Sequence, residues 1–197
     1  MLPPIIAYHC NFSTYGFWMP NDPRGSWSDY VRCYDLFIAA GEATAADVTR
    51  SAAGKRLAPD QKSRQAAGRT VLAHPKMIFD ERQIQAVGRG FTKAVGEAHF
   101  RIVACAIMRN HVHAVVLRHS RHIEMVVGHL RSRATKQLGL EGLRPAQPIW
   151  GVGGWHRFLH SAAEIAQCVA YVNANPRKAG LPAQSWDFVT AWNGAAA

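Results

Sequence analysis

Long apolar runs, paired cysteines and acidic side chains are all scarce in this chain, and each scarcity narrows what the protein can be. No stretch reaches the ~20 apolar residues that span a bilayer, so we expect no membrane partner. The N-terminus lacks a basic segment followed by a long apolar run, so we expect no secretion. The four cysteines, Cys10, Cys33, Cys105 and Cys168, show no C-x-x-C spacing, which favours reduced thiols in a cytoplasmic protein.

Acidic residues number 13 against 23 lysines and arginines, which gives a formal net charge of +10 and a pI near 10.0. This balance indicates a polyanionic partner, nucleic acid before membrane, because no long cationic amphipathic helix is present. A basic surface that only aids solubility is the alternative that charge leaves open. A length of 197 residues suits one domain. We interpret 1–197 as that domain, with an Ala/Gly-rich insertion at 41–75 and a C-terminal tail at 186–197.

A histidine pair lies inside the apolar stretch 108–117, MRNHVHAVVL, whose β-branched content predicts a buried strand. Side chains alternate between the two faces of a strand, so His111 and His113 point the same way and Val112 the other. Two imidazoles on a rigid element can supply two ligands of a divalent-metal site. The same pair can also be hydrogen-bonded edge residues, which so short a motif does not exclude.

The last helix places a tyrosine away from its apolar face. An S-x-x-E signature predicts that this helix begins at about residue 162. At 100° per residue, Tyr171 and Asn175 fall on one stripe, about a quadrant from the apolar seam. The Tyr171 hydroxyl can therefore face a site, and Asn175 one turn later can face the same one. We expect Pro176 to end the helix near Asn175.

The other periodic segments complete an α/β domain with a central antiparallel sheet. The predicted strands span 5–15, 100–108 and 111–118, and the Arg109-Asn110 turn joins the last two as a hairpin. The predicted helices span 80–98, 121–138 and 162–175, and the first begins with a capping box at Asp80 and Gln83. His9, in the first strand, could share a site with His113, but we interpret it as an ordinary sheet residue.

The order of these motifs resembles the single-tyrosine HUH transposases, above all the REP-associated tyrosine transposases and their insertion-sequence relatives. The likeness covers most of the chain. It rests on Asn110-His111-Val112-His113, on Tyr171-x-x-x-Asn175-Pro176-x-Lys178-Ala179-Gly180-Leu181, and on Thr14-Tyr15-Gly16 with Trp18, Pro20 and Asp22-Pro23-Arg24-Gly25. Arg109 stands where the family usually has Pro, and Phe17 where Thr is common. The resemblance implies a ferredoxin-like domain of the HUH endonuclease type.

The resemblance also implies an activity, which is the nicking and rejoining of single-stranded or hairpin DNA through a covalent 5′-phosphotyrosine. It gives Tyr171 the role of nucleophile. It makes His111, His113 and Asn175, where relatives carry Gln or Asn, the ligands of Mg²⁺ or Mn²⁺. From donor chemistry alone, two imidazoles and an amide oxygen can hold a divalent cation, and histidine suits manganese or zinc better than magnesium.

Basic and aromatic side chains outside this constellation supply candidate DNA contacts. The loop over 16–33 interleaves aromatics with arginines, which can stack on bases and hold phosphates, or can simply fold over the core. The helix at 121–138 carries a basic face, which either contacts the DNA backbone or only aids solubility. Our candidate contacts are Arg24, Arg32, Arg131, Arg133, Lys136, Trp18 and Trp155.

Two other functions stay open at this point. A transposase-derived protein could bind hairpin DNA without cutting it, although an intact set of site residues favours the enzyme. An RNA-binding module on a ferredoxin-like sheet is disfavoured, because the chain has no aromatic-rich Lys/Arg-Gly-Phe run. We expect a cytoplasmic protein, nucleoid-associated when bound to DNA, that acts as a monomer or homodimer.

Overall fold

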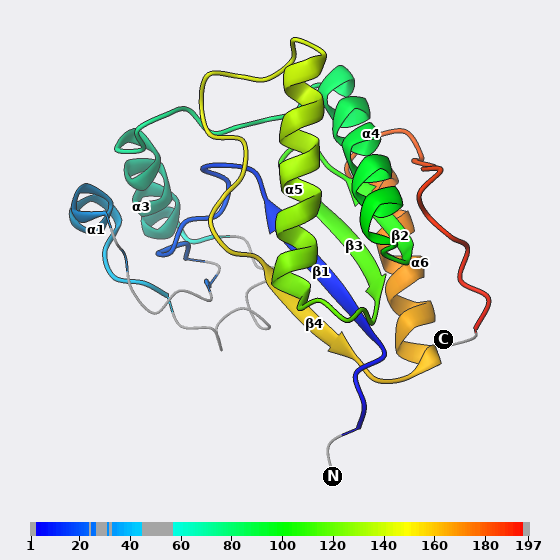
Figure 1. The fold of residues 1–197 in the computed structure, drawn as a ribbon. Coiled ribbons are helices and arrows are strands. Elements are labelled where there is room, and N and C mark those ends of the chain that lie inside the picture. Colours follow the sequence, from blue (N-terminus) through cyan, green and yellow to red (C-terminus); the bar gives the residue numbers. More distant parts are fainter. Residues whose placement is uncertain (1–2, 24, 27–30, 32, 45–56, 195–197) are drawn as a thin grey trace. The chain divides into compact units, whose positions relative to one another are not determined.

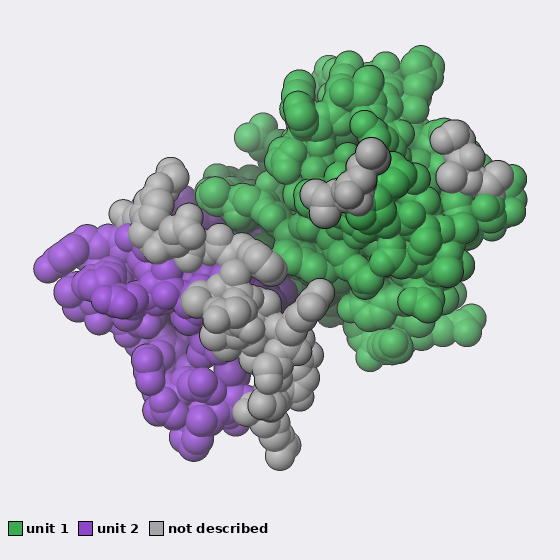
Figure 2. Space-filling model, turned by 90° about the horizontal axis from the view of Figure 1, so that it is seen from below, with its two compact units in different colours: residues 1–13, 78–197 green, residues 14–77 purple. Residues whose placement is uncertain are grey.

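The computed structural model of this chain describes residues 3–194 except 24, 27–30, 32 and 45–56 (Figure 1). The chain divides into two compact units, one formed by residues 1–13 and 78–197 and the other by residues 14–77 (Figure 2). The insertion expected at 41–75 lies within the second unit. Among the described residues, no helix is long and apolar enough to cross a membrane.

The first unit is built on a four-stranded antiparallel sheet. Its strands are β1 (Ala7–Ser13), β2 (Ile102–Ile107), β3 (His111–Leu117) and β4 (Trp155–Leu159), and their spatial order is β2-β3-β1-β4. With α4 (Glu81–Ala98) between β1 and β2, and α5 (Ile123–Leu140) between β3 and β4, the chain order is β-α-β-β-α-β. This order is that of a ferredoxin-like fold, so the predicted fold class is confirmed.

The prediction of three strands was incomplete, because β4 was not predicted. Two of the five β4 residues, His156 and Arg157, are polar, and the strand lies at the sheet edge, where Phe158 is half exposed. A short edge strand with little burial carries a weak hydrophobic signal. The predicted hairpin between β2 and β3 is present, and the Met108 N–H donates to the His111 carbonyl at 2.8 Å.

The helices cover the two faces of this sheet unequally. The pair α4 and α5 lies on one face, and α6 (Ala162–Lys178) lies on the other (Figure 1). The α6 side of the core contains Ala7, Ala104, Ala106, Val115, Leu117, Ile165, Cys168 and Val172. Helices α4 and α5 approach closely at Gly90, where a Cβ would lie 2.5 Å from the Cα of Ala134. Tertiary packing thus explains a glycine that intrinsic helix propensity disfavours.

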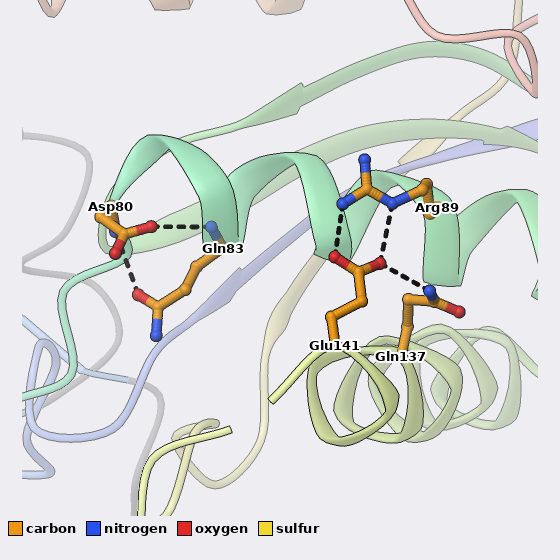
Figure 3. Close-up of polar contacts among 5 residues, drawn as sticks. All are labelled: Asp80, Gln83, Arg89, Gln137 and Glu141. Atoms are coloured by element: carbon orange, nitrogen blue, oxygen red, sulfur yellow. Dashed lines mark hydrogen bonds and ion pairs between the residues drawn. The ribbon is translucent and has the colours of Figure 1, made fainter. Parts of the chain in front are cut away.

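Polar contacts fix the start of α4 and tie this helix to the end of α5 (Figure 3). Asp80 accepts from the Gln83 N–H at 2.7 Å, and Gln83 accepts from the Asp80 N–H at 3.1 Å, so the predicted capping box is confirmed. The guanidinium of Arg89 donates to Glu141, with Nε 2.8 Å from Oε1, and Gln137 donates to the same oxygen at 2.6 Å. These hydrogen bonds lower the pKa of Glu141 to about 2.

Helix α6 continues through Pro176 to Lys178, so the predicted end near Asn175 is wrong. A proline has no N–H, so it removes one backbone hydrogen bond from a helix. Because only Arg177 and Lys178 follow Pro176 in α6, no complete turn is left for the proline to disrupt. Gly180, at φ 71°, then closes the helix. Its N–H donates to Arg177, and the Leu181 N–H donates to the Pro176 carbonyl at 2.9 Å, which is the pattern of a Schellman motif.

The C-terminal tail docks on the same unit. Trp186 lies over Gly88, where a Cβ would meet its ring at 2.3 Å, and the ring of Phe188 lies 6.0 Å from that of Phe91. The Thr190 N–H donates to the Ile102 carbonyl at 2.9 Å. The segment interpreted as a C-terminal tail, 186–197, is therefore packed against this unit as far as the described residues extend.

The described residues of the second unit include the helices α1 (Tyr34–Ala40) and α3 (Pro59–Thr70). Helix α3 lies within the segment 41–75 that was interpreted as an insertion, whereas α1 was not predicted. A small cluster of Met19, Leu36 and Ala40 packs between them. Gly68 of α3 is part of this packing, since a Cβ there would lie 3.0 Å from that of Ala40.

Candidate active site

The two histidines of β3 turn their ring nitrogens toward each other on the sheet face that α6 covers. The Nε2 atoms of His111 and His113 are 3.1 Å apart, and the two rings are nearly perpendicular, at 89°. His113 is 5% exposed. Its register neighbours on that face are Asn11 of β1 and Ala106 of β2, and these small or short side chains leave room for the imidazoles. The shared face is the one that strand alternation predicted.

The second nitrogen of each ring also has a partner. The Nδ1 of His111 lies 2.6 Å from Oδ1 of Asn110, and the Nδ1 of His113 lies 3.1 Å from Nε2 of His9. An amide oxygen only accepts, so this contact favours the tautomer in which His111 carries its hydrogen on Nδ1 and directs the Nε2 lone pair into the site. Metal-ligating histidines commonly show this arrangement, in which the remote nitrogen is held by a neighbour.

His9 belongs to this cluster, so its interpretation as an ordinary sheet residue was wrong. It is 6% exposed, its ring stacks on that of His113 at a centroid distance of 5.2 Å, and Tyr171 lies edge-on at 5.8 Å. His9 and His113 are 104 residues apart in the sequence. In the β1–β3 register His9 stands opposite Val115 and His113 opposite Asn11, so the two rings meet diagonally across the strands.

Burial keeps all three imidazoles neutral at neutral pH. Desolvation is the main cause in each case, and it lowers the pKa of His111 to about 4 and that of His113 to about 3. The pKa of His9 falls to about 4, chiefly through burial and further through the positive charge of Arg157. A neutral imidazole is the form that binds a metal, so these rings do not have to lose a proton first.

The separation of the histidine nitrogens suits two bonds to one ion. With metal–nitrogen bonds of about 2.1 Å, nitrogens this far apart enclose an angle of about 95° at the metal. No group of three or more His, Cys, Asp and Glu side chains forms a metal-ligand cluster in the described part of the chain. A cation held by His111 and His113 would therefore take its other ligands from amide, water or phosphate oxygens. The side-chain N–H of Asn175 donates to the Tyr171 carbonyl at 3.1 Å, which leaves the amide oxygen as the atom that could bind a cation.

Tyr171 stands beside the histidines and not in the core. Its side chain is 46% exposed, and its ring centroid lies 5.6 Å from that of His113. The Nζ atom of Lys178 is 5.5 Å from the Tyr171 ring centroid. The same helix buries Cys168 and Val172 against the sheet, so the predicted separation of Tyr171 from the apolar seam is confirmed. A phenol, a lysine and a histidine pair thus share one partly open site.

Strand β4 adds two side chains on the same face. Trp155 is half-buried, and its ring lies edge-on to that of His9 at 5.7 Å. Arg157 stands opposite His9 in the register, is half exposed, and approaches Glu164 at 3.7 Å. The sequence named Trp155 as a candidate DNA contact, gave no role to Lys178 beyond its place in the motif, and did not reveal Arg157. The alternation of Trp155, Arg157 and Leu159 was the signal that could have revealed both the strand and its arginine.

The predicted DNA contacts fall in different places. Arg131 packs its guanidinium over the Phe12 ring at 5.0 Å and donates to the Gly153 carbonyl, and burial lowers its pKa to about 10, so it has a role inside the fold. Arg133 pairs with Glu97 at 2.6 Å, and Lys136 is exposed. These three residues lie on α5, on the sheet face away from α6 and Tyr171 (Figure 1).

The candidate contacts of the first loop belong to the second unit. The indole N–H of Trp18 donates to the Gly25 carbonyl at 2.9 Å. This contact is one way in which the loop folds on itself. Arg24 and Arg32 lie outside the residues that the structure describes.

Two transposase structures are among the solved structures that are similar to this chain. No family model and no curated protein matches the chain. One similar structure, described as a REP-associated tyrosine transposase bound to a REP hairpin, shares 11% identity and a TM-score of 0.49, over 92% of this chain and 73% of that one. The other, a candidate transposase from Deinococcus radiodurans R1, shares 11% identity and a TM-score of 0.38, over 87% of this chain and 91% of that one. At these values neither likeness assigns a function to this chain.

Proposed function

We propose that this protein is a metal-dependent enzyme that nicks and rejoins single-stranded or hairpin DNA through a covalent 5′-phosphotyrosine. One observation carries the proposal. The Tyr171 ring lies 5.6 Å from His113, whose Nε2 is 3.1 Å from Nε2 of His111. A partly exposed phenol beside two neutral imidazoles combines a nucleophile with a pair of metal ligands. The motifs that resemble the single-tyrosine transposases contain these same residues.

The chemistry exchanges one phosphate ester for another. The Tyr171 oxygen attacks the phosphorus, and a bond to the phenol oxygen forms as the bond to the 3′ oxygen breaks. The phenolic proton passes to solvent, and the departing oxygen takes up a proton to become a 3′-hydroxyl. Attack by a 3′-hydroxyl on the phosphotyrosine reverses the step and rejoins the strand. Because one ester replaces another, the cycle needs no nucleotide cofactor.

The proposed metal ligands are His111, His113 and the amide oxygen of Asn175. A Mg²⁺ or Mn²⁺ ion bound there would offset the negative charge that develops on the phosphate oxygens. Imidazole nitrogens favour manganese over magnesium, which prefers oxygen ligands, so Mn²⁺ is the cation of choice for experiments. The buried, neutral rings of this site support such a role, since no proton has to be displaced.

The side chains around the site suit an unpaired nucleic acid strand. Arg157 and Lys178 provide positive charge on the Tyr171 face, and the Trp155 ring is available for stacking. Arg133 and Lys136 provide charge on the opposite face, so a strand that contacts both sets must pass around the sheet. The net charge of +10 attracts any such polyanion.

The position of a label in the DNA tests this proposal. The probe is a pool of single-stranded oligonucleotides with a randomised internal segment, labelled at either the 5′ or the 3′ end and incubated with the protein and Mn²⁺. A 5′-phosphotyrosine retains the downstream fragment, so the adduct on a denaturing gel should carry the 3′ label only. Binding of the pool without any adduct would instead support a hairpin-binding protein that has lost turnover. A 5′-labelled adduct would contradict the proposed polarity.

A further inference from the structure

The contact between His9 and His113 is buried and directional. Nε2 of His9 lies 3.1 Å from Nδ1 of His113, and the two rings are stacked at 26°. The Trp155 ring also contacts that of His9, edge-on at a centroid distance of 5.7 Å. His9 therefore approaches the side of the His113 ring that is remote from Nε2 of His111, and it contacts the candidate ligand rather than the position of the ion.

The contact between His9 and His113 can determine which nitrogen of the His113 ring carries its hydrogen. A neutral ring carries one hydrogen, on Nδ1 or on Nε2, and only the other nitrogen has a lone pair for a cation. For His113 to direct a lone pair from Nε2 toward His111, its hydrogen must be on Nδ1. A buried N–H needs an acceptor, and the Nε2 atom of His9 is at hydrogen-bonding distance.

We propose that His9 is a positioning residue that holds His113 in the Nδ1–H tautomer and fixes its ring, so that Nε2 can bind a divalent cation. The inference rests on the proposed function, because it assumes that His113 is a metal ligand. Asn110 plays the corresponding part for His111, at 2.6 Å from its Nδ1. The Nδ1 atoms of the two candidate ligands thus have different partners, which are the preceding residue Asn110 for His111 and a histidine of another strand for His113.

Two substitutions at position 9 separate hydrogen bonding from packing. Gln places an amide oxygen near the position of Nε2 and can accept from His113, whereas Phe keeps a ring and has no acceptor. His156→Phe is the matched control, because His156 stands opposite Cys10 and points to the other sheet face. In calorimetric titration of the full chain with Mn²⁺ alone, His9→Phe should weaken binding about 10- to 100-fold. His9→Gln should restore most of the affinity, and His156→Phe should leave it unchanged.

The tautomer can also be read directly, without any substitution. Nitrogen-15 NMR distinguishes a protonated from an unprotonated ring nitrogen, so wild-type protein saturated with Zn²⁺, which is diamagnetic, should show the His113 hydrogen on Nδ1. The Nδ1 atom of His113 should also show a coupling across the hydrogen bond to Nε2 of His9, because the two atoms lie 3.1 Å apart. Loaded wild-type protein with the hydrogen on Nε2, or without this coupling, would overturn the inference, even if every variant at position 9 failed to fold.

The titrations distinguish failure of this inference from failure of the proposed function. If Mn²⁺ binding is abolished in His111→Ala and His113→Ala but not in His9→Phe, the metal site stands and His9 only packs. If wild type and His113→Ala bind Mn²⁺ equally, His113 is no ligand, and both the metal site and the inference are wrong.

Discussion

The ammonium group of Lys178 lies 5.5 Å from the centre of the Tyr171 ring. Tyr171 is two turns before Lys178 on the same helix. This relationship exists because α6 continues through Pro176, which the sequence analysis did not anticipate. A cation at this distance attracts the ring and any negative charge that develops on its oxygen. The end of α6 therefore contributes to the environment of the proposed nucleophile.

Neutralising that cation should slow the covalent step. Lys178→Met keeps the aliphatic stem and removes the charge, and the loss of about 1 kcal/mol of charge stabilisation corresponds to a roughly 5-fold slower reaction. The measurement is the initial rate of adduct formation with saturating oligonucleotide and Mn²⁺. Lys178→Arg is the control that keeps the charge and should react faster than Lys178→Met. Equal rates for Lys178→Met and wild type would show that this charge does not assist the reaction.

The third proposed ligand makes a prediction about metal affinity. Asn175→Ala removes the amide oxygen and should weaken Mn²⁺ binding about 10-fold, measured by calorimetry without DNA. Asn175→Gln keeps an amide oxygen on a longer stem and should bind Mn²⁺ more tightly than Asn175→Ala. Unchanged Mn²⁺ affinity in Asn175→Ala would remove this residue from the ligand set while leaving the histidine pair in place.

The two basic faces of the first unit can be compared through the salt dependence of DNA binding. Arg157→Gln should flatten the slope of log affinity against log salt by roughly one unit, because it removes one phosphate-binding charge. The double variant Arg133→Ala with Lys136→Ala should flatten it by roughly one unit for each of its side chains that binds a phosphate. Lys62→Ala removes an exposed charge from α3 of the second unit and serves as the control for both faces. An unchanged slope in either variant would show that DNA does not bind to that face.

Acid should weaken the contact between α4 and α5. Hydrogen bonds from Arg89 and Gln137 lower the pKa of Glu141 from 4.5 to about 2, so its contribution to stability is present above pH 4.5 and is lost as the pH falls toward 2. Arg89 is about half exposed and Glu141 is partly exposed, so solvent screens the pair and we expect less than about 1 kcal/mol. Urea unfolding of wild type and Glu141→Gln should therefore differ more at pH 7 than at pH 3. A difference that does not change with pH would contradict this assignment.

The local sequence pattern was sufficient to predict on which face of a single strand or helix a side chain lies. Alternation in a strand placed His111 and His113 on one face, and helical spacing separated Tyr171 from the apolar seam of α6. Neither result requires knowledge of what packs against the element. The order of the periodic segments predicted an α/β domain with an antiparallel sheet, whereas the ferredoxin-like class came from the resemblance to the single-tyrosine transposases.

Contacts that depend on register between distant strands could not be predicted in this way. His9 meets His113 because β1 pairs with β3 so that Cys10 stands opposite Ala114, and nothing in either strand alone encodes that alignment. Arg157 was missed because its strand is short and exposed at the sheet edge. The end of α6 was predicted too early because the residue before a proline tends to avoid helical backbone angles. The hydrogen bonds from the Gly180 and Leu181 N–H groups override that tendency here.

The central claim is that the Tyr171 oxygen forms the bond to phosphorus. Tyr171→Phe deletes that oxygen and keeps the ring, so the variant should fold, bind Mn²⁺ and bind the randomised oligonucleotide pool as wild type does. The direct measurement is the yield of protein–DNA adduct on a denaturing gel after incubation with the pool and Mn²⁺. We predict an adduct with wild type and none with Tyr171→Phe. Cleavage of the pool by Tyr171→Phe at the wild-type yield would contradict the account, because the attacking group would then be another nucleophile such as water.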